Sequence, residues 1–377
     1  MNKSTTIFPL YSAADSPGMP YNDIFFRIVF VEIGIQVYMA KNRELVTLGH
    51  GSGGKLTHDL IGEVIVPALY GAEGAPPMED SALITAPSTA LSFTTDSYVV
   101  SPWVFPGGNI GDLAFNGTVN DLAMSGADPI AISMGLILEE GFAMDDLRLV
   151  MTAMGEAARK AGIPVVCGDT KVVPHGKADA IFINTSGVGV RRGGVEIRAS
   201  GARQGDVIII NGTIGDHGIA VMSAREGLRF QAPVQSDTAA LHTLVRALLD
   251  GGVEVHSMRD PTRGGLATTI CEIAADSKVA ILLDEREIPL NEAVAGACEL
   301  LGLDPMTVAN EGKMILVLPE REAEKAISIM RGHPLGQRSS IIGRVTDGRV
   351  GRVTCLSVVG GDRVINMPHG EILPRIC

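Results

Sequence analysis

The sequence predicts an α+β protein of two domains followed by a C-terminal tail, and three observations support this fold class. The chain has 377 residues, which is enough for two domains of roughly 150 residues each. Hydrophobic residues make up 46% of it and aromatic residues only 4%, with 45 glycines, so we expect aliphatic cores and many tight turns. The pattern of strands and helices also starts again near Gly201. We therefore expect one domain over residues 43–200, a second over 201–348 and a mobile tail over 349–377.

Charge and cysteine content exclude several classes of protein. The formal net charge is −12, so no domain has the basic excess needed to bind a nucleic-acid backbone. The five cysteines are an odd number without a CxxC pair, which argues against a disulfide framework or a zinc site and favours a reducing cytoplasm. We expect four of them to be small core residues, whereas Cys377 ends the chain and needs another explanation.

The first part of the chain differs from the rest. Seven of the 16 aromatic residues lie within residues 1–40, and we expect a poorly ordered N-terminal extension over 1–42. The apolar stretch over 24–40 contains Arg27 and Glu32 and is shorter than the roughly 20 residues of a membrane span, so we expect no membrane segment. Our hypothesis is that residues 1–38 are a non-native extension before a start at Met39, and the alternative is an extra strand. The intact mass of the natively expressed protein distinguishes them.

In the first predicted domain, strand and helix patterns alternate. The clearest helix begins at Asp145 and Asp146, whose charges favour a helix N-terminus, and ends at Gly162 after apolar residues at helical spacing. We expect two further helices, over 56–69 and 109–125, and strands over 44–48, 82–85, 91–100, 130–138, 163–167 and 181–190.

The second predicted domain repeats this alternation with different lengths. We expect strands over 206–211, 279–283, 314–318, 340–346 and 351–359. We expect a turn over 215–218 and helices over 219–226, 241–249, 264–275, 291–301 and 323–331.

A glycine-rich loop follows the first predicted strand. It nearly matches the phosphate-binding pattern of P-loop proteins, but Leu56 stands where a magnesium-binding Ser or Thr belongs, so a true P-loop is not expected. Its backbone amides can still approach a phosphate closely, and the alternative is a plain flexible loop. The loop consists of Gly51, Ser52, Gly53, Gly54 and Lys55 with the two residues before them.

Three aspartates are candidates for a magnesium site. Asp96 ends an apolar strand, where a carboxylate is costly without a cation or hydrogen bonds, and Asp80 lies in the preceding segment. Asp121 follows small residues on one face of the helix over 109–125. Magnesium often binds one or two carboxylates together with phosphate oxygens, but each aspartate taken alone could equally be solvated or cap a helix.

Segments next to buried strands and a segment at a helix N-terminus are further candidates to line a site. The segments over 168–171 and 310–313 follow or precede buried strands, and they carry Lys171 and Glu311. The segment over 260–265 places backbone amides and the Arg263 guanidinium at a helix N-terminus, which suits an anion.

The chain ends in a cysteine on an extended segment. Pro374 limits the conformations of this segment, and Arg375 can offset the C-terminal carboxylate, which would otherwise raise the pKa of the Cys377 thiol. The alternative is an accidental terminal cysteine.

These features together resemble the HypE family of hydrogenase maturation factors, in the aminoimidazole-ribonucleotide synthetase (PurM-like) superfamily. The resemblance covers residues 45–377. It rests on residues 50–55, 95–98, 105–111, 120–121, 168–173, 215–218, 260–265, 310–313 and 374–377. The terminal cysteine is the most specific feature, because sister families such as selenophosphate synthetase and thiamine-monophosphate kinase lack one of this kind.

The resemblance implies a homodimer that binds ATP and Mg²⁺ near the junction of its two N-terminal domains. It also implies that a carbamoyltransferase partner (HypF) loads a carboxamide onto the Cys377 thiol, which this protein dehydrates to a thiocyanate with ATP. The cyanide then passes to iron on a HypC–HypD scaffold complex for the [NiFe] hydrogenase centre.

The same resemblance implies roles for individual residues. Asp96 and Asp121 would hold magnesium, with Asp80 and Asp216 as secondary candidates, and Glu311 would be the general base with Lys171 beside it. The nucleotide would be bound by Gly51, Ser52, Gly53, Gly54, Lys55, Asn120, Asp169, Thr170 and Lys171.

Two other functions remain open at this stage. A small-molecule kinase or synthetase of the same superfamily would explain the glycines and aspartates but make Cys377 incidental. A non-catalytic carbamoyl carrier would explain the tail but leave the acidic residues without a purpose.

Overall fold

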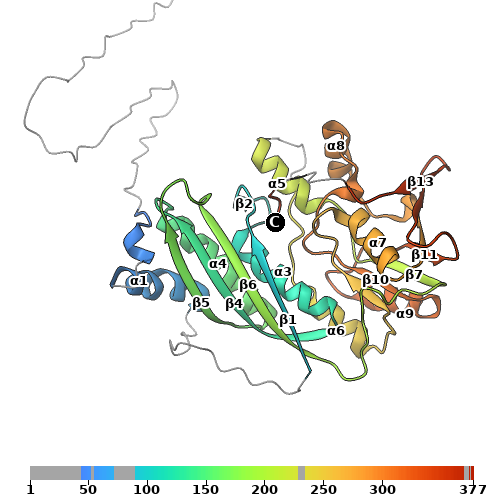
Figure 1. The fold of residues 1–377 in the computed structure, drawn as a ribbon, viewed down its shortest axis with the longest axis horizontal. Helices are drawn as coiled ribbons and strands as arrows, with labels where there is room; N and C mark the ends of the chain where they lie inside the picture. Colours follow the sequence, from blue (N-terminus) through green and yellow to red (C-terminus); the bar gives the residue numbers. More distant parts are fainter. Residues whose placement is uncertain (1–43, 52–54, 72–89, 228–233, 369–372, 374) are drawn as a thin grey trace, which may run out of the picture. The chain divides into compact units, whose positions relative to one another are not determined.

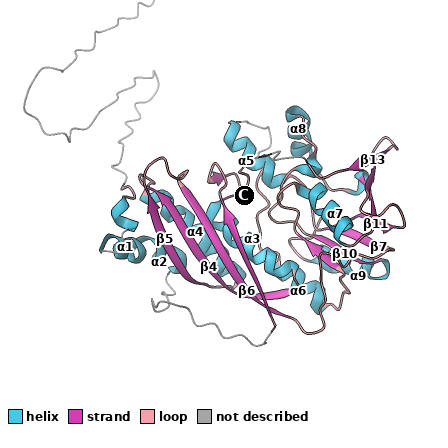
Figure 2. Cartoon of the chain, in the orientation of Figure 1, coloured by secondary structure: helices cyan, strands magenta, loops and turns pink. Residues whose placement is uncertain are grey.

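The computed structural model describes residues 44–51, 55–71, 90–227, 234–368, 373 and 375–377. Within these residues it contains two large β-sheets with helices packed against them, as Figure 1 and Figure 2 show. The predicted extension over 1–42 and the predicted strand over 82–85 lie outside the described residues. None of the helices in the described segments combines the length and the apolar character needed to cross a bilayer.

The N-terminal sheet has the strand order β1-β6-β4-β5. β6 runs antiparallel to both β1 and β4, whereas β4 and β5 are parallel. Its strands are β1 (Leu91–Tyr98), β4 (Ala127–Glu139), β5 (Val165–Val173) and β6 (Ile181–Arg191). The other elements are η1 (Leu48–Gly51), α1 (Lys55–Leu60), η2 (Ile61–Ile65), α2 (Val66–Tyr70), the hairpin β2 (Val104–Phe105) and β3 (Gly108–Asn109), α3 (Ile110–Met124) and α4 (Met144–Ala161).

Helix α3 is the central helix of this half. A capping box begins it: the Asn109 side chain accepts a hydrogen bond from the Gly111 N–H, and the Asp112 carboxylate accepts one from the Asn109 N–H. Nearly all of its residues are buried, because it packs on the sheet on one side and on α4 on another. This packing carries Asp121, near its C-terminal end, into the interior.

The C-terminal sheet has the strand order β13-β12-β9-β11-β7-β10-β8. Its central strands are fully buried runs of aliphatic residues, as expected for a sheet covered on both faces. Its strands are β7 (Asp206–Ile210), β8 (Ser257–Arg259), β9 (Ala280–Asp284), β10 (Ile315–Pro319), β11 (Ser340–Thr346), β12 (Val353–Leu356) and β13 (Asp362–Ile365). Its helices are α5 (Asp216–Glu226), α6 (His242–Asp250), α7 (Gly265–Asp276), α8 (Glu292–Leu301) and α9 (Ala323–Gly332), with short turns η4 (Glu285–Glu287), η5 (Pro305–Thr307) and η6 (Glu320–Glu322).

Five expectations need correction. Residues 44–48 form an isolated β-bridge at Leu45 and the start of η1 rather than a strand. Residues 168–171 are part of strand β5 rather than a loop after it, because they continue the parallel pairing with β4. Strand β12 lies within the strand predicted over 351–359, but β12 and β13 both join the C-terminal sheet, so the second domain extends beyond its predicted boundary at 348. Residues 216–218 form the first turn of α5 instead of a turn before it. Cys167 is exposed, whereas Cys271, Cys298 and Cys355 are buried as expected.

Candidate active site

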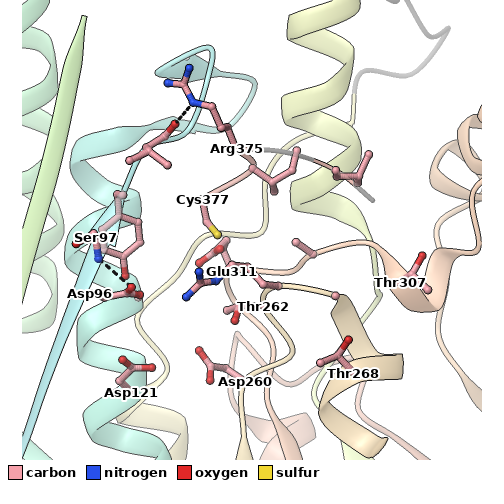
Figure 3. Close-up of a pocket in the computed structure, with 18 of the residues that line it drawn as sticks. Asp96, Ser97, Asp121, Asp260, Thr262, Thr268, Thr307, Glu311, Arg375 and Cys377 are labelled. Atoms are coloured by element: carbon pink, nitrogen blue, oxygen red, sulfur yellow. Dashed lines mark hydrogen bonds between the residues drawn. The ribbon is translucent and has the colours of Figure 1, made fainter. Parts of the chain in front are cut away.

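The end of the chain lies in a cavity of about 340 Å³. Its walls come from the end of β1, one face of α3, the start of α7, the loop before β10 and the C-terminal tail (Figure 1 and Figure 3). These segments are widely separated in the sequence, so only the tertiary structure brings them together.

Four carboxylic acids line this cavity: Asp96, Asp121, Asp260 and Glu311. Asp121 accepts a hydrogen bond of 2.9 Å from the Thr94 hydroxyl. Burial raises the pKa of Asp260 to about 7, and the neighbouring Asp121 adds to the shift. Burial also raises the pKa of Asp121. Ionising these acids together is therefore costly, and a bound cation would reduce that cost.

Glu311 is the most unusual of the four acids. Its side chain is 3% exposed, and its Oε1 atom has no hydrogen-bond partner among the described residues. Burial raises the pKa of Glu311 well above its ordinary value, and the charges of Asp260 and Asp237 add to this. A buried carboxyl group without a partner is costly, so this arrangement indicates a functional group.

The loop that carries Glu311 is held firmly from behind. The Asp237 carboxylate accepts hydrogen bonds from the backbone N–H groups of Glu311 and Gly312, at 3.1 and 3.2 Å. It also forms a buried ion pair of 2.8 Å with Lys313. Gly312 is required here, because a Cβ atom would lie 1.8 Å from the Asp237 carbonyl oxygen.

Asn120 was predicted to bind nucleotide, but the structure gives it another role. Its side-chain amide donates to the backbone carbonyls of Ala239 and Glu311, and its oxygen accepts from the Leu241 N–H. Asn120 is 1% exposed and does not line the cavity. It fixes the Glu311 loop against α3.

The predicted cluster around Lys171 does not form within one chain. Lys171 lies on the edge strand β5, where its ammonium group pairs with the Asp169 carboxylate at 2.8 Å, and both side chains are largely exposed. Thr170 is buried in the same strand. The expectation that Lys171 lies beside Glu311 is wrong for the single chain, because β5 is the strand furthest from β1 in the sheet.

Asp216 also lies away from the cavity. Its carboxylate is 5% exposed and accepts hydrogen bonds from the Thr213 hydroxyl and the Asn291 side-chain amide. It therefore stabilises the start of α5, and the expectation that it joins the other aspartates as a metal ligand is wrong for this cavity.

The glycine-rich loop is described only at its ends. Gly51 ends η1 and Lys55 begins α1, and Asp80 and residues 52–54 lie outside the described residues.

The acids of this cavity do not form a complete metal site by themselves. No group of three or more His, Cys, Asp and Glu side chains within the described segments converges closely enough to hold a metal ion by itself. Asp96 and Asp121 nevertheless line one cavity, with Asp260 opposite them in Figure 3. This donor set fits a magnesium ion that takes its remaining ligands from phosphate oxygens and water.

The tail places the terminal thiol in the same cavity. The Val99 N–H donates to an oxygen of the Cys377 carboxylate at 3.2 Å, and the Ser101 N–H donates to the Arg375 carbonyl at 3.1 Å. Arg375 in turn donates to the Val99 carbonyl and pairs with Asp179. Figure 3 shows the Cys377 sulfur turned toward Glu311. The thiol and the unpartnered acid therefore share one enclosed space.

Sequence reasoning missed two residues of this cavity. Asp260 was noted only as part of an anion-binding turn, although an acid directly after a strand is a usable signal. Tyr98 lies within the segment 95–98 without a role expected from the sequence, and its hydroxyl is buried with no partner among the described residues. No sequence signal marked Tyr98, because its burial depends on α3.

Gly117 makes room for Tyr98, and this close approach gives a stability prediction. A Cβ atom on Gly117 would lie 2.0 Å from the Tyr98 hydroxyl oxygen, and the Tyr98 ring is itself buried. We expect Gly117→Ala to lower the free energy of unfolding by about 1–3 kcal/mol in denaturant melts, despite the better helix propensity of alanine.

Gly296→Ala is the matched control. Gly296 is an exposed position in α8 with no atom within 4 Å of its Cβ direction. This variant should be neutral or stabilising by up to about 1 kcal/mol. An unchanged melt for Gly117→Ala would contradict the close packing of Tyr98 on α3.

Two family models match the two halves of the chain. The model of the AIR synthase related protein N-terminal domain covers residues 78–191, and that of the C-terminal domain covers residues 203–356. Two α+β domains with an acidic cavity thus define the protein as a member of the AIR synthase related, PurM-like class.

Relatives that match most of the chain show which family within this class the protein belongs to. The chain is 48% identical to carbamoyl dehydratase HypE of Azotobacter vinelandii, over 88% of this chain and 97% of that protein. It matches a crystal structure of hydrogenase maturation protein HypE in complex with ATP with a TM-score of 0.83 and 44% identity, over 88% of this chain and 99% of that one. It also matches a crystal structure of a HypE–HypF complex, with a TM-score of 0.72 and 46% identity, over 74% of this chain and 90% of that one. The chain belongs to the HypE family of carbamoyl dehydratases, which confirms the resemblance and the fold class predicted from the sequence.

Proposed function

We propose that this protein uses ATP to dehydrate a carboxamide on the Cys377 sulfur to a thiocyanate. The cyanide would become a ligand of iron in [NiFe] hydrogenase. The observation that supports this most strongly is the position of the chain's last sulfur, inside an acidic cavity and facing a buried, unpartnered Glu311. A thiol that only served as a surface attachment point would not need this surrounding.

The chemistry assigns a task to each group. A carboxamide oxygen is a poor leaving group, and ATP supplies the phosphoryl group with which that oxygen can depart. In the balanced reaction, S-carboxamide and ATP give S-cyanate, ADP, phosphate and a proton, as the carbon–oxygen bond breaks and the nitrogen loses both of its hydrogens. In this proposal Glu311, in its ionised form, would accept a proton from that nitrogen.

The remaining cavity residues would bind and orient. Asp96 and Asp121 would hold Mg²⁺, and the Arg263 guanidinium and the amides at the start of α7 would stabilise phosphate oxygens. We retain the glycine-rich loop over 51–55 as the predicted cover of the nucleotide phosphates.

Partners follow from the same family. The HypE–HypF complex supports a HypF-type carbamoyltransferase as the enzyme that loads Cys377. A homodimer, delivery to a HypC–HypD-type scaffold and a cytoplasmic location are proposed with it.

The direct test is mass spectrometry of the C-terminal peptide. Cleavage after Glu371 releases the hexapeptide 372–377, which contains Cys377 and no other cysteine. After incubation with carbamoyl phosphate, HypF and ATP, the carbamoylated peptide should lose about 18 Da, the mass of one water. A carboxamide that persists in the presence of ATP would instead support a carrier without catalytic activity.

The metal assignment gives a separate prediction. Asp121→Asn should lower ATP turnover by at least about tenfold, because the neutral amide is a poorer magnesium ligand, while the Thr94 hydrogen bond and the fold survive. Turnover is measured by phosphate release, and folding by thermal melting and gel filtration.

Asp112→Asn is the matched control for this prediction. Asp112 lies on the same helix but outside the cavity, where its carboxylate caps the helix. Its substitution should leave ATP turnover nearly unchanged. Normal turnover in Asp121→Asn would exclude Asp121 as a metal ligand.

A further inference from the structure

Two residues on one face of α5 form hydrogen bonds to the docked tail. His217, Val221 and Arg225 are spaced four residues apart and therefore share this face. Arg225 donates hydrogen bonds to the Ser101 and Arg375 carbonyls. Val221 belongs to the same hydrophobic cluster as Ile376, the residue before the terminal cysteine.

His217 makes the contact nearest to the thiol. Its Nε2 atom lies 2.9 Å from the Ile376 carbonyl oxygen, and its ring is fully buried. A carbonyl oxygen can only accept, so Nε2 carries the proton and donates it. A buried donor on α5 thus binds the backbone carbonyl of the residue that directly precedes Cys377.

The second ring nitrogen fixes this arrangement. Nδ1 lies 2.8 Å from the Ser236 hydroxyl, which also accepts the Thr238 N–H. With the proton on Nε2, Nδ1 accepts from Ser236, and the ring packs edge-on against Phe105 with centroids 5.3 Å apart. Burial lowers the pKa of His217, which favours this neutral form. The imidazole therefore has one orientation, with its donor directed at the tail.

We propose that His217 is a positioning residue for the reaction: it holds the Ile376 carbonyl so that the Cys377 sulfur stays in the acidic cavity. The inference rests on the proposed function, since it names the residue that presents the substrate carried on Cys377. When the tail leaves, the Nε2–H group loses its partner in a buried place, which favours the return of the tail.

The test measures docking without catalysis. The rate at which iodoacetamide alkylates Cys377 is followed on the hexapeptide 372–377 by mass spectrometry, since a docked thiol reacts more slowly than a free one. We expect His217→Asn to increase this rate about tenfold, because the shorter amide cannot reach Ile376. His217→Gln, which keeps a donor near the Nε2 position, should restore most of the protection.

His242→Asn is the matched control. His242 is also a buried histidine whose Nε2 lies 3.1 Å from a backbone carbonyl, that of Ala161, but it is not near the tail. This variant should leave the Cys377 alkylation rate unchanged. If His217→Asn does not fold, Ser236→Ala tests the same point by freeing the imidazole, and it should also speed alkylation.

The outcomes separate this proposal from the proposed function. If His217→Asn is alkylated at the wild-type rate, the positioning role is overturned and the proposed reaction is unaffected. The same holds for Ser236→Ala when that variant is used instead. Alkylation requires neither ATP nor HypF, so it decides the role of His217 even if no thiocyanate forms. In the full reaction, His217→Asn should lower kcat and leave the KM for ATP unchanged.

Discussion

Replacing Cys377 by alanine is expected to abolish thiocyanate formation completely. The sulfur is the atom to which the carboxamide is attached in the proposed reaction, and no other cysteine lies in the cavity among the described residues. ATP turnover in the presence of HypF and carbamoyl phosphate should fall to its background level, because the acceptor for the phosphoryl group is missing. Both are measured on the same sample, by mass spectrometry and by phosphate release.

The fold and the docked tail should survive this change. Residues 375–377 are held by hydrogen bonds of their backbone atoms and of the side chains of Arg375, His217 and Arg225, all of which remain in Cys377→Ala. Cys167→Ala, which removes an exposed cysteine on β5, is the matched control and should keep full activity. ATP turnover that persists in Cys377→Ala and depends on a free small molecule would instead favour a kinase or synthetase.

Glu311→Gln is expected to lower the rate of thiocyanate formation by about 10²- to 10⁴-fold, the usual contribution of a positioned general base. Glutamine has nearly the same shape and keeps the backbone hydrogen bonds to Asp237, so ATP binding should remain. The phosphorylated carboxamide or its breakdown products should accumulate before thiocyanate. Single-turnover measurements on the hexapeptide 372–377 follow this step.

The same variant should change the pH dependence of stability. The pKa of Glu311 is raised well above its ordinary value, and that of Asp260 is raised from 3.8 to about 7. The folded protein therefore retains protons that the unfolded chain releases, and the stability from these groups is lost as the pH rises from about 4 through 7 and above. Glu311→Gln cannot ionise, so its thermal midpoint should exceed that of the wild type at about pH 8 and match it more closely near pH 5.

Glu254→Gln serves as the control for both measurements. Glu254 is exposed and pairs with His256 and Arg321 outside the cavity. Normal thiocyanate formation in Glu311→Gln would exclude Glu311 as the base. A thermal midpoint that does not exceed the wild type at high pH would contradict its burial without a partner.

Local patterns predicted most of the secondary structure. The helix over 145–161 is confirmed, because its acidic first turn, apolar stripe and terminal Gly162 all act within the helix itself. Strand β5 was predicted too short, since its polar second half pairs with β4 at the sheet edge and needs no apolar pattern. Strand β13 was not predicted, because its exposed residues 362–364 form a strand only by pairing with β12.

The candidate site divides in the same way. Asp121, Glu311 and Cys377 were singled out from the sequence, and the structure places all three around one cavity. Lys171 and Asp216 were singled out by similar reasoning but lie elsewhere in the chain's own fold. No local sequence feature distinguishes these two residues from the three that line the cavity. The packing of α3 and the two sheets decides which residues come together.

The sequence by itself determined the chemical groups available to this protein: an acidic chain with aliphatic residues for its cores, glycine-rich turns and a cysteine at position 377. The tertiary structure decided how those groups act. It placed the thiol in one cavity with a carboxyl group whose pKa burial raises, and it provided a buried imidazole to hold the tail there. Burial, pKa and hydrogen-bond satisfaction depend on all the neighbours of a group at once, and those neighbours come from segments more than a hundred residues apart.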